Sequence, residues 1–282
     1  MQPQYLFMKL IYNTLEVVNW AKEHTDFTVG FVPTMGALHQ GHLSLIDQAK
    51  KRVDKVVVSI FVNPKQFDSN SDFQTYPLNL DNDLELLKNK AVDLVFHPLS
   101  AEELYRHEDF STFSFDGIDQ VMEGIHRTNH FTGVARVVKL FFDLIQPDLA
   151  FFGEKDYQQL LIIKKMISVL GLKTQVVACP TVRENSGLAM SSRNIRLTVQ
   201  EKELAANIFK TLNFCKKKLS LSSIEELEKE CFAQLASFSN PEYFEIRNAN
   251  DLSKNGNNQA KWRAFTATKL GNVRLIDNIA LN

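Results

Sequence analysis

The chain has 282 residues, of which 44% are hydrophobic and 23% charged, and its formal net charge at pH 7 is −1. This composition is typical of a globular protein, and without a dense basic stripe nucleic acid is not expected as the main partner. Three widely spaced cysteines predict neither a disulfide framework nor a cysteine-built zinc site. No apolar run reaches the length of a membrane span, and the first residues lack the apolar core of a signal peptide. We therefore expect a cytoplasmic protein with no membrane partner.

The first two-thirds of the chain alternates strand-like and helix-like patterns. The run of β-branched residues at 55–63 is typical of a strand covered on both faces, as in a parallel sheet. Strands separated by helices predict right-handed βαβ units, and hence an α/β fold with a doubly wound parallel sheet. Strands are predicted at 27–33, 55–63, 92–98, 148–154 and 173–180, and helices at 42–52, 80–90, 134–145 and 157–171.

The pattern changes after Pro180. A polar, irregular stretch at 181–198 is followed by two helical patterns, near 199–218 and 222–237, and then by short strand-like runs to the end of the chain. Helices followed by strands predict a small α+β domain. We place the boundary at 180, giving a nucleotide-binding domain (1–180) and a C-terminal α+β lid domain (181–282).

The turn after the first long strand, "TMGALHQGH", carries the first candidate site. Gly36 and Gly41 permit close approach of the backbone to a ligand, but a P-loop would continue with Lys and Ser/Thr, and here His42 and Leu43 follow. His42 falls at a helix start, where N–H groups point outward and favour an anion. His39 is three residues earlier, so both rings can face one ligand. Taken alone, either histidine is best interpreted as a surface residue. Taken together with the strand and the glycines, the two histidines predict a phosphate site.

Two later segments could complete such a site. Lys155 follows Gly153 at the end of a predicted strand, and Asp156 suits the N-cap of the next helix. Ser191, Ser192 and Arg193 supply hydroxyl and guanidinium donors in consecutive positions. Taken singly, these segments are more readily a surface lysine and a linker turn. Together, the H-x-G-H turn and the Ser/Arg loop resemble the two signatures of the HIGH/KMSKS nucleotidyltransferases.

Longer motifs resemble one family closely. "PTMGALHQGHLSLI", "SIFVNPKQF", "FFGEKDYQQL", "VRENSGLAMSSRN" and "RLIDNIAL" are similar to the pantoate–β-alanine ligases, or pantothenate synthetases, over nearly the whole chain. The resemblance implies that ATP and Mg²⁺ activate pantoate as pantoyl-adenylate with release of pyrophosphate. β-Alanine then attacks, giving pantothenate and AMP. It also implies a Rossmann-like N-terminal domain, a smaller C-terminal domain and a homodimer.

The resemblance assigns roles by position. Catalysis is assigned to His42, as proton donor, and to Lys155, Ser191, Ser192 and Arg193. Pantoate and β-alanine are assigned to Asn63, Gln66 and Gln159, with Tyr76 and Arg127 close to the site, while the magnesium ligands stay open. ATP is assigned to Met35, Gly36, Ala37, Leu38, His39, Gln40, Gly41, His42, Gly153, Glu154, Lys155, Asp156, Val182, Met190, Ser191, Ser192 and Arg193.

Three departures from the family pattern stand out. Gln40 replaces a usual Glu, Asn248 replaces a usual Asp, and the stretch from Arg127 to Asn129 lacks a common proline. Two other functions remain open: a different adenylyltransferase of the same superfamily, and a non-catalytic nucleotide-binding protein with this fold. A pantoate site would also need apolar walls, for which Phe61 or Phe67 are candidates.

Overall fold

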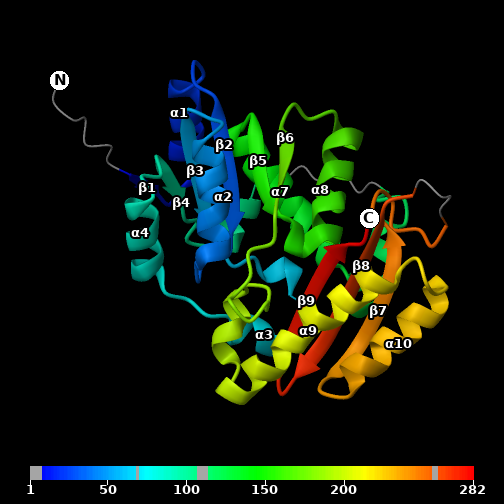
Figure 1. Ribbon diagram of the computed structural model, residues 1–282. Coiled ribbons are helices and arrows are strands. Elements are labelled where there is room, and N and C mark those ends of the chain that lie inside the picture. Colours follow the sequence, from blue (N-terminus) through cyan, green and yellow to red (C-terminus); the bar gives the residue numbers. More distant parts are fainter. Residues whose placement is uncertain (1–7, 68–69, 107–113, 256–259) are drawn as a thin grey trace.

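The computed structural model describes residues 8–67, 70–106, 114–255 and 260–282. Within them lie two β-sheets, a six-stranded parallel sheet and a three-stranded antiparallel sheet. Figure 1 shows the large sheet and its helices in blue to green and the small sheet beside it in orange to red. The predicted α/β fold, with a Rossmann-like parallel sheet and a smaller C-terminal α+β part, is confirmed.

The order in which the chain adds strands to the large parallel sheet reverses at β2. Its strand order is β1-β4-β3-β2-β5-β6, so the chain moves outward from β2 and later returns on the other side of β2 as β5. β2 and β5 are direct neighbours, with Gly30 opposite Leu149. Ligands of open α/β sheets bind at such a switch point. The strands are β1 (Lys9–Ile11), β2 (Val29–Thr34), β3 (Lys55–Ile60), β4 (Leu94–Phe96), β5 (Leu149–Gly153) and β6 (Gln175–Cys179).

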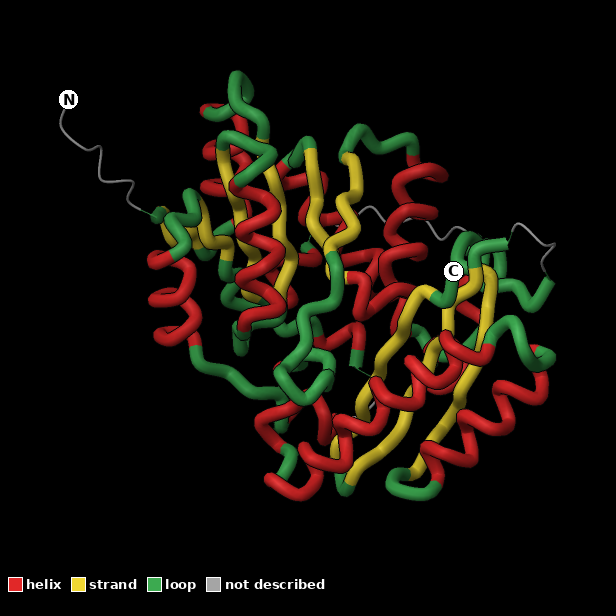
Figure 2. Tube along the Cα trace, viewed as in Figure 1, coloured by secondary structure: helices red, strands yellow, loops and turns green. Residues whose placement is uncertain are grey.

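Helices cover both faces of the large sheet. Alternate strand residues point to opposite sides: Phe31 and Val57 belong to one buried cluster, Val32 and Val58 to another. The first cluster contains residues of α1 (Thr14–Glu23), α7 (His130–Ile145) and α8 (Tyr157–Leu170). The second contains residues of α2 (Gln40–Lys50) and α4 (Leu80–Asn89), which Figure 2 shows as red coils beside the yellow strands. Burial on both faces explains the continuous apolar run at 55–63.

The small sheet also has two buried faces. Helices α9 (Val199–Lys218) and α10 (Ile224–Ala236) pack on one face, where Ile246 lies among their apolar residues. On the other face, Tyr243 and Phe265 belong to the same buried cluster as the large sheet. The hydrophobic core therefore continues across residue 180, and the division into domains 1–180 and 181–282 stays a prediction. The strands are β7 (Asn240–Asn248), β8 (Trp262–Leu270) and β9 (Val273–Ala280).

Several short elements were not predicted from the sequence. β1 forms an edge of the large sheet, and α1 buries Val17 and Trp20 against the core. The remaining elements are α3 (Asn70–Gln74), α5 (Ala101–Tyr105), α6 (Glu123–His126), η1 (Pro64–Gln66), η2 (Ile118–Gln120), η3 (Glu154–Asp156) and η4 (Ser192–Arg196).

Among the described residues, no helix is both long and apolar enough to cross a membrane.

Candidate active site

A cavity of about 230 Å³ lies beyond the carboxyl ends of β2, β3, β5 and β6. His42, Lys155 and Arg193, from three segments far apart in sequence, all line it. The structure thus brings together the histidine turn, the turn that carries Lys155 and the Ser/Arg loop. The predicted site residues that line the cavity are Met35, His39, Gly41, His42, Asn63, Gln66, Tyr76, Arg127, Gly153, Lys155, Asp156, Gln159, Val182, Met190, Ser191, Ser192 and Arg193.

The remaining predicted ATP-site residues are absent from the cavity lining. Gln40 is exposed at the first turn of α2, so the departure from Glu falls on the protein surface. Glu154 forms an ion pair with Arg263, 3.1 Å between Oε2 and Nη2. Gly36, Ala37 and Leu38 form the turn that precedes the histidines.

The main-chain donors of the β2–α2 turn face the protein. Gly36 and Ala37 have φ values of +81° and +50°, a left-handed pair that glycine makes possible at the first position. The carboxylate of Asp83 on α4 accepts hydrogen bonds from the N–H groups of Ala37 (2.8 Å) and Leu38 (2.7 Å). The Gly36 N–H donates to Thr34 Oγ1 at 3.2 Å. This turn therefore does not offer a P-loop's backbone cradle. The sequence did not reveal this role, because an acidic residue in the first turn of a helix is common and Asp83 looks like any other.

The two histidines cap the helix that they begin. His39 Nδ1 accepts a hydrogen bond from the Gly41 N–H at 3.0 Å, and His42 Nδ1 accepts one from the His39 N–H at 3.3 Å. Within the first turn of α2, the N–H of Gly41 is therefore already used by the protein and does not point outward to an anion. The ring centroids are 4.1 Å apart, and a Cβ at position 41 would lie 2.7 Å from the His39 ring. Gly41 is required there because the ring occupies the space of a side chain.

Both imidazoles are neutral donors at pH 7. Burial, reinforced by the charge of Lys155, lowers the pKa of His39 to about 4. Burial, followed by the effects of His39 and Lys155, lowers the pKa of His42 to about 3. Because each Nδ1 accepts a hydrogen bond, the proton of the neutral ring is assigned to Nε2. Both rings line the cavity, so each has an Nε2–H donor available for a ligand oxygen.

The turn after β5 provides a cation and a carboxylate. Lys155 lies on η3, and its Nζ is 3.2 Å from Oδ1 of Asp156. Asp156 occupies the N-cap position of α8 as predicted, but its side chain makes no capping hydrogen bond. The predicted capping role is therefore wrong: the carboxylate pairs with Lys155 at the edge of the cavity.

The two glutamines that open α8 have different roles. Gln159 lines the cavity. The Gln158 amide group instead donates to the carbonyl oxygens of Ile118 (2.7 Å) and Val121 (2.8 Å) and is buried. Gln158 fixes the segment before α6, and Gln159 is the residue available to a substrate.

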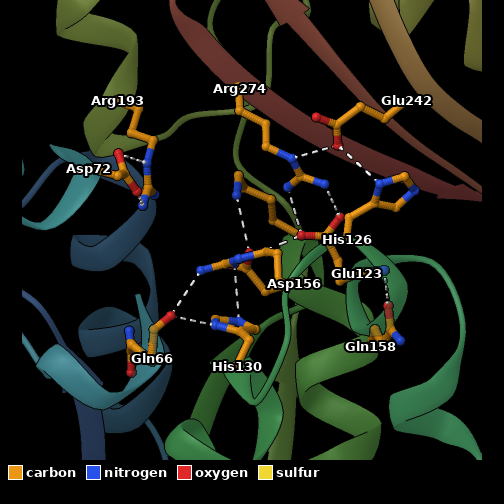
Figure 3. Close-up of polar contacts among 12 residues, drawn as sticks. Gln66, Asp72, Glu123, His126, His130, Asp156, Gln158, Arg193, Glu242 and Arg274 are labelled. Carbon is orange, nitrogen blue, oxygen red and sulfur yellow. Dashed lines mark hydrogen bonds and ion pairs between the residues drawn. The ribbon is translucent and has the colours of Figure 1, made fainter. Parts of the chain in front are cut away.

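The Ser/Arg loop contacts the histidine turn directly. Ser192 Oγ donates to the carbonyl oxygen of Ala37 at 3.0 Å, and Ser191 Oγ accepts from the Arg193 N–H at 3.3 Å. Figure 3 shows the Arg193 guanidinium meeting Asp72 of α3, with 2.7 Å between Nη2 and Oδ2. Burial would raise the pKa of Asp72, but Arg193 and Arg196 outweigh it and lower the pKa. Asp72 was not anticipated from the sequence, because no local pattern connects it to an arginine 121 residues further along the chain.

A second part of the cavity contains amide groups. Gln66 Nε2 lies 2.6 Å from the sulfur of Met35, and Asn63 Nδ2 donates to Gln66 Oε1 at 3.3 Å. Asn63 is buried and also donates to the carbonyl of Gly133 at 3.1 Å, so it positions Gln66. A Cβ at Gly133 would lie 2.2 Å from the carbonyl oxygen of Lys65, so only glycine lets α7 approach η1 this closely. The apolar wall beside these amides is formed by Phe61, Phe67, Val134, Val137, Val138 and Phe141.

Arg127 and His130 hold the backbone of η1. Arg127 Nη2 donates to the carbonyl oxygen of Gln66 at 3.1 Å, and His130 Nδ1 lies 2.8 Å from the same oxygen. Burial and the nearby Arg127 charge lower the pKa of His130 to about 3. The neutral ring donates from Nδ1 and accepts from Arg127 at Nε2, 3.1 Å away. His130 was missed in the sequence. Asn129, one of the family departures, adopts a left-handed φ of +62° before α7, a conformation that Asn tolerates.

Behind Arg127, a buried ion-pair network joins α6 to the small sheet. Both terminal nitrogens of Arg274 lie 2.7 Å from the carboxylate oxygens of Glu123, and the Tyr243 hydroxyl donates to the same carboxylate at 2.8 Å. Figure 3 shows Arg274 also reaching Glu242. Burial would raise the pKa of Glu123, but the bonds and charge of Arg274 outweigh it and lower the pKa to about 2. Glu123 is therefore a carboxylate throughout the ordinary pH range.

The cavity offers little to a metal ion from the protein itself. Within the described ranges, no group of three His, Cys, Asp or Glu side chains is arranged to hold a metal ion. Asp156 is the one carboxylate among the described residues that line the cavity. A hard cation here would need most of its oxygen ligands from phosphate and water, which is typical of Mg²⁺ in nucleotide sites.

Fold and site together define the class: a nucleotidyltransferase-type α/β protein with an H-x-G-H turn and a Ser/Arg loop at the switch point of its sheet. A model of the family described as "Pantoate-beta-alanine ligase" matches residues 9–280. The chain belongs to the pantoate–β-alanine ligase family.

Individual relatives match over almost their full length. The pantothenate synthetase of Christiangramia forsetii is 48% identical over 261 residues, covering 90% of this chain and 92% of that protein. The crystal structure of pantothenate synthetase from Thermus thermophilus has a TM-score of 0.89 and 36% identity, covering 97% of this chain and 99% of the other. A Francisella tularensis pantoate–β-alanine ligase complexed with β,γ-ATP and β-alanine has a TM-score of 0.80 and 35% identity, covering 97% and 98%.

Proposed function

We propose that this cavity condenses pantoate with β-alanine at the expense of ATP, through a pantoyl-adenylate, and releases AMP and pyrophosphate. The observation that carries the proposal is the convergence of His42, Lys155 and Arg193 on one cavity, with Gln66 and Gln159 in its lining. The first three supply donors and positive charge for a triphosphate. The two amides suit the hydroxyls of a small organic acid.

The first step is electrostatic. Pantoate's carboxylate is ionised at neutral pH, so attack on the α-phosphorus of ATP needs no general base. The barrier is the approach of one anion to another, and it falls when fixed donors meet the charge that develops on the phosphate oxygens. The neutral Nε2–H groups of His39 and His42, the Lys155 ammonium and the Arg193 guanidinium supply these donors. His42 acts as a hydrogen-bond donor in its neutral form, since its pKa is about 3.

The second step takes place in the same cavity, next to Gln66 and Gln159. The neutral amine of β-alanine attacks the acyl carbon of the adenylate, the bond from that carbon to the phosphate oxygen breaks, AMP leaves as a stable anion, and the amine nitrogen gives up one proton to solvent as the amide forms. Gln66 and Gln159 hold the pantoyl hydroxyls, and the aromatic and α7 side chains face its dimethyl carbon. Asn63 holds the side chain of Gln66, and Arg127 and His130 hold its backbone carbonyl.

Mg²⁺ would enter as part of the substrate, MgATP, and Asp156 is the lining carboxylate that could contact it. The carboxylate and Lys155 are 3.2 Å apart, which lets them face a metal ion and a phosphate oxygen together. The family resemblance further supports a cytoplasmic homodimer. Sedimentation equilibrium of the purified protein tests the dimer: a mass of one 32.2 kDa chain at micromolar concentration would contradict it.

The decisive experiment is AMP release, measured with pantoate or β-alanine omitted in turn. Pantoate-dependent exchange of labelled pyrophosphate into ATP without β-alanine, and AMP release only with both acids, is the expected result. Lys155→Ala should lower exchange by roughly 10²–10³-fold, the effect of losing one such donor. Lys229→Ala, on an exposed ion pair of α10, is the matched control and should behave as wild type.

Other outcomes identify the two alternative functions. Pyrophosphate release with a different acceptor, and none with pantoate, would indicate another adenylyltransferase. ATP binding without any pantoate-dependent exchange would indicate a non-catalytic nucleotide-binding protein.

A further inference from the structure

Two consecutive residues of the C-terminal strand β9, Asp277 and Asn278, hold both phosphate-facing segments. Asn278 is buried, and its side-chain amide donates to two successive carbonyl oxygens of η3, those of Glu154 (2.9 Å) and Lys155 (2.8 Å). Its own oxygen accepts from Arg263. Both ends of the amide are therefore used, and the orientation of the amide is fixed by its partners.

Asp277 holds the other segment through one arginine. Its carboxylate accepts two hydrogen bonds from Arg183, at 2.6 and 2.9 Å. Arg183 also donates to the carbonyl of Gly187 at 3.1 Å and stacks on the Phe209 ring, 3.8 Å from its centroid. The pairing is buried, with Asp277 only 5% exposed.

Arg183 lies at the base of the Ser/Arg loop. It pairs with Ala189 in an isolated antiparallel bridge, and the Met190 N–H donates to the carbonyl of Val182 at 3.0 Å. The loop that carries Ser191 to Arg193 therefore begins from a narrow hairpin anchored to Asp277.

We propose that Asp277 and Asn278 are positioning residues, which fix the distance between Lys155 and the Ser/Arg loop before the triphosphate binds. The proposal rests on the proposed function, because it assigns the two segments to one ligand. The reason is geometric. Adjacent residues of one strand hold the backbone of η3 and the base of the 182–190 hairpin, so neither segment moves independently of β9. A displacement of about 1 Å in such a group can reduce a rate about a hundredfold.

The test replaces Asn278 with Asp, which has the same shape but turns a donor of two hydrogen bonds into an acceptor facing two carbonyl oxygens. We expect pantoate-dependent pyrophosphate exchange to fall by about a hundredfold at saturating pantoate, with the KM for pantoate unchanged within about twofold. Thr268→Val is the matched control: Thr268 is buried in the same sheet, and its hydroxyl bonds to Ser239 at 2.7 Å, away from η3. It should lose thermal stability and keep its exchange rate.

A double-mutant comparison separates positioning from general damage. If Asn278 acts through Lys155, then Asn278→Asp should weaken binding of a non-hydrolysable ATP analogue in the wild-type background and have little further effect in Lys155→Ala. Equal effects in both backgrounds would overturn the proposal, as would an exchange loss in Thr268→Val matching that of Asn278→Asp. Failure of the proposed function is a distinct result, since the wild-type protein would then show no pantoate-dependent exchange.

Discussion

Glu123→Gln tests how much the buried ion-pair network between α6 and the small sheet stabilises the fold. The change keeps the shape of the side chain and removes its charge. Arg274 then retains Glu242 as its one charged partner in the network, while the new amide NH₂ faces a guanidinium donor. Breaking a buried pair by removing one partner is strongly destabilising, because the other charge stays buried.

The magnitude follows from the pKa of Glu123. The carboxyl has a pKa of 4.5 in its ordinary environment and about 2 in the folded protein. At 1.36 kcal/mol for each pH unit, this difference corresponds to roughly 3 kcal/mol of stability. The sign is set by the lowered pKa: the contribution is complete above pH 4.5 and is lost as the pH falls through the folded-state value near 2.

The assay is urea unfolding of wild type and Glu123→Gln at neutral and acid pH. At pH 7 the variant should be less stable by roughly 3 kcal/mol, and the difference should shrink toward pH 3, because the wild-type carboxylate gradually loses its advantage. Glu225→Gln, on the exposed surface of α10, is the control and should show no comparable pH-dependent difference. A destabilisation by Glu123→Gln that stays the same at both pH values would refute the electrostatic reasoning.

Three further predictions concern the cavity. Asp83→Ala leaves the buried N–H of Leu38 and the partly buried N–H of Ala37 without an acceptor. It should cost roughly 2 kcal/mol in urea unfolding and raise the KM for ATP. The exposed Asp81→Ala should do neither, and a matching loss in both variants would contradict this. Gly133→Ala should displace η1 and its Gln66, raising the KM for pantoate and costing about 1–3 kcal/mol; an unaltered KM would show that η1 adapts. In NMR titrations, His42 should show no midpoint between pH 5 and 8, because its pKa is about 3; a midpoint near the ordinary 6.5 would exclude the neutral-donor role.

The sequence predicted the elements whose pattern repeats over many residues. The continuous apolar run at 55–63 and the helical stripe at 134–145 located β3 and α7, because burial on both faces of a strand and on one face of a helix leaves these patterns; β3 ends at Ile60 and α7 begins at His130. The edge strand β1 was missed, since three residues are too few for a pattern. The helix start at Asp156 was located, but the side chain's partner was not, because Lys155 competes with the capping hydrogen bond.

The candidate site was predictable where glycines, histidines and serines stand together in a motif. His42, Lys155 and Arg193 were named on that basis and line one cavity. Asp83 and Asp72 were not found, because each acts on a turn or loop remote in sequence, through contacts that only the tertiary fold creates. An acidic residue early in a helix looks the same whether it faces solvent or holds a functional turn.

The inward-facing N–H groups of the histidine turn have a consequence for how this site tolerates change. In a P-loop, the phosphate rests on main-chain donors, which survive almost any replacement of the side chains around them. Here Asp83 and Thr34 already occupy the N–H groups of Gly36, Ala37 and Leu38, and the donors that this turn presents to the cavity are two imidazoles. Replacing either histidine removes a donor outright, so a phosphate site built on imidazoles gives up the tolerance to substitution that a backbone cradle has.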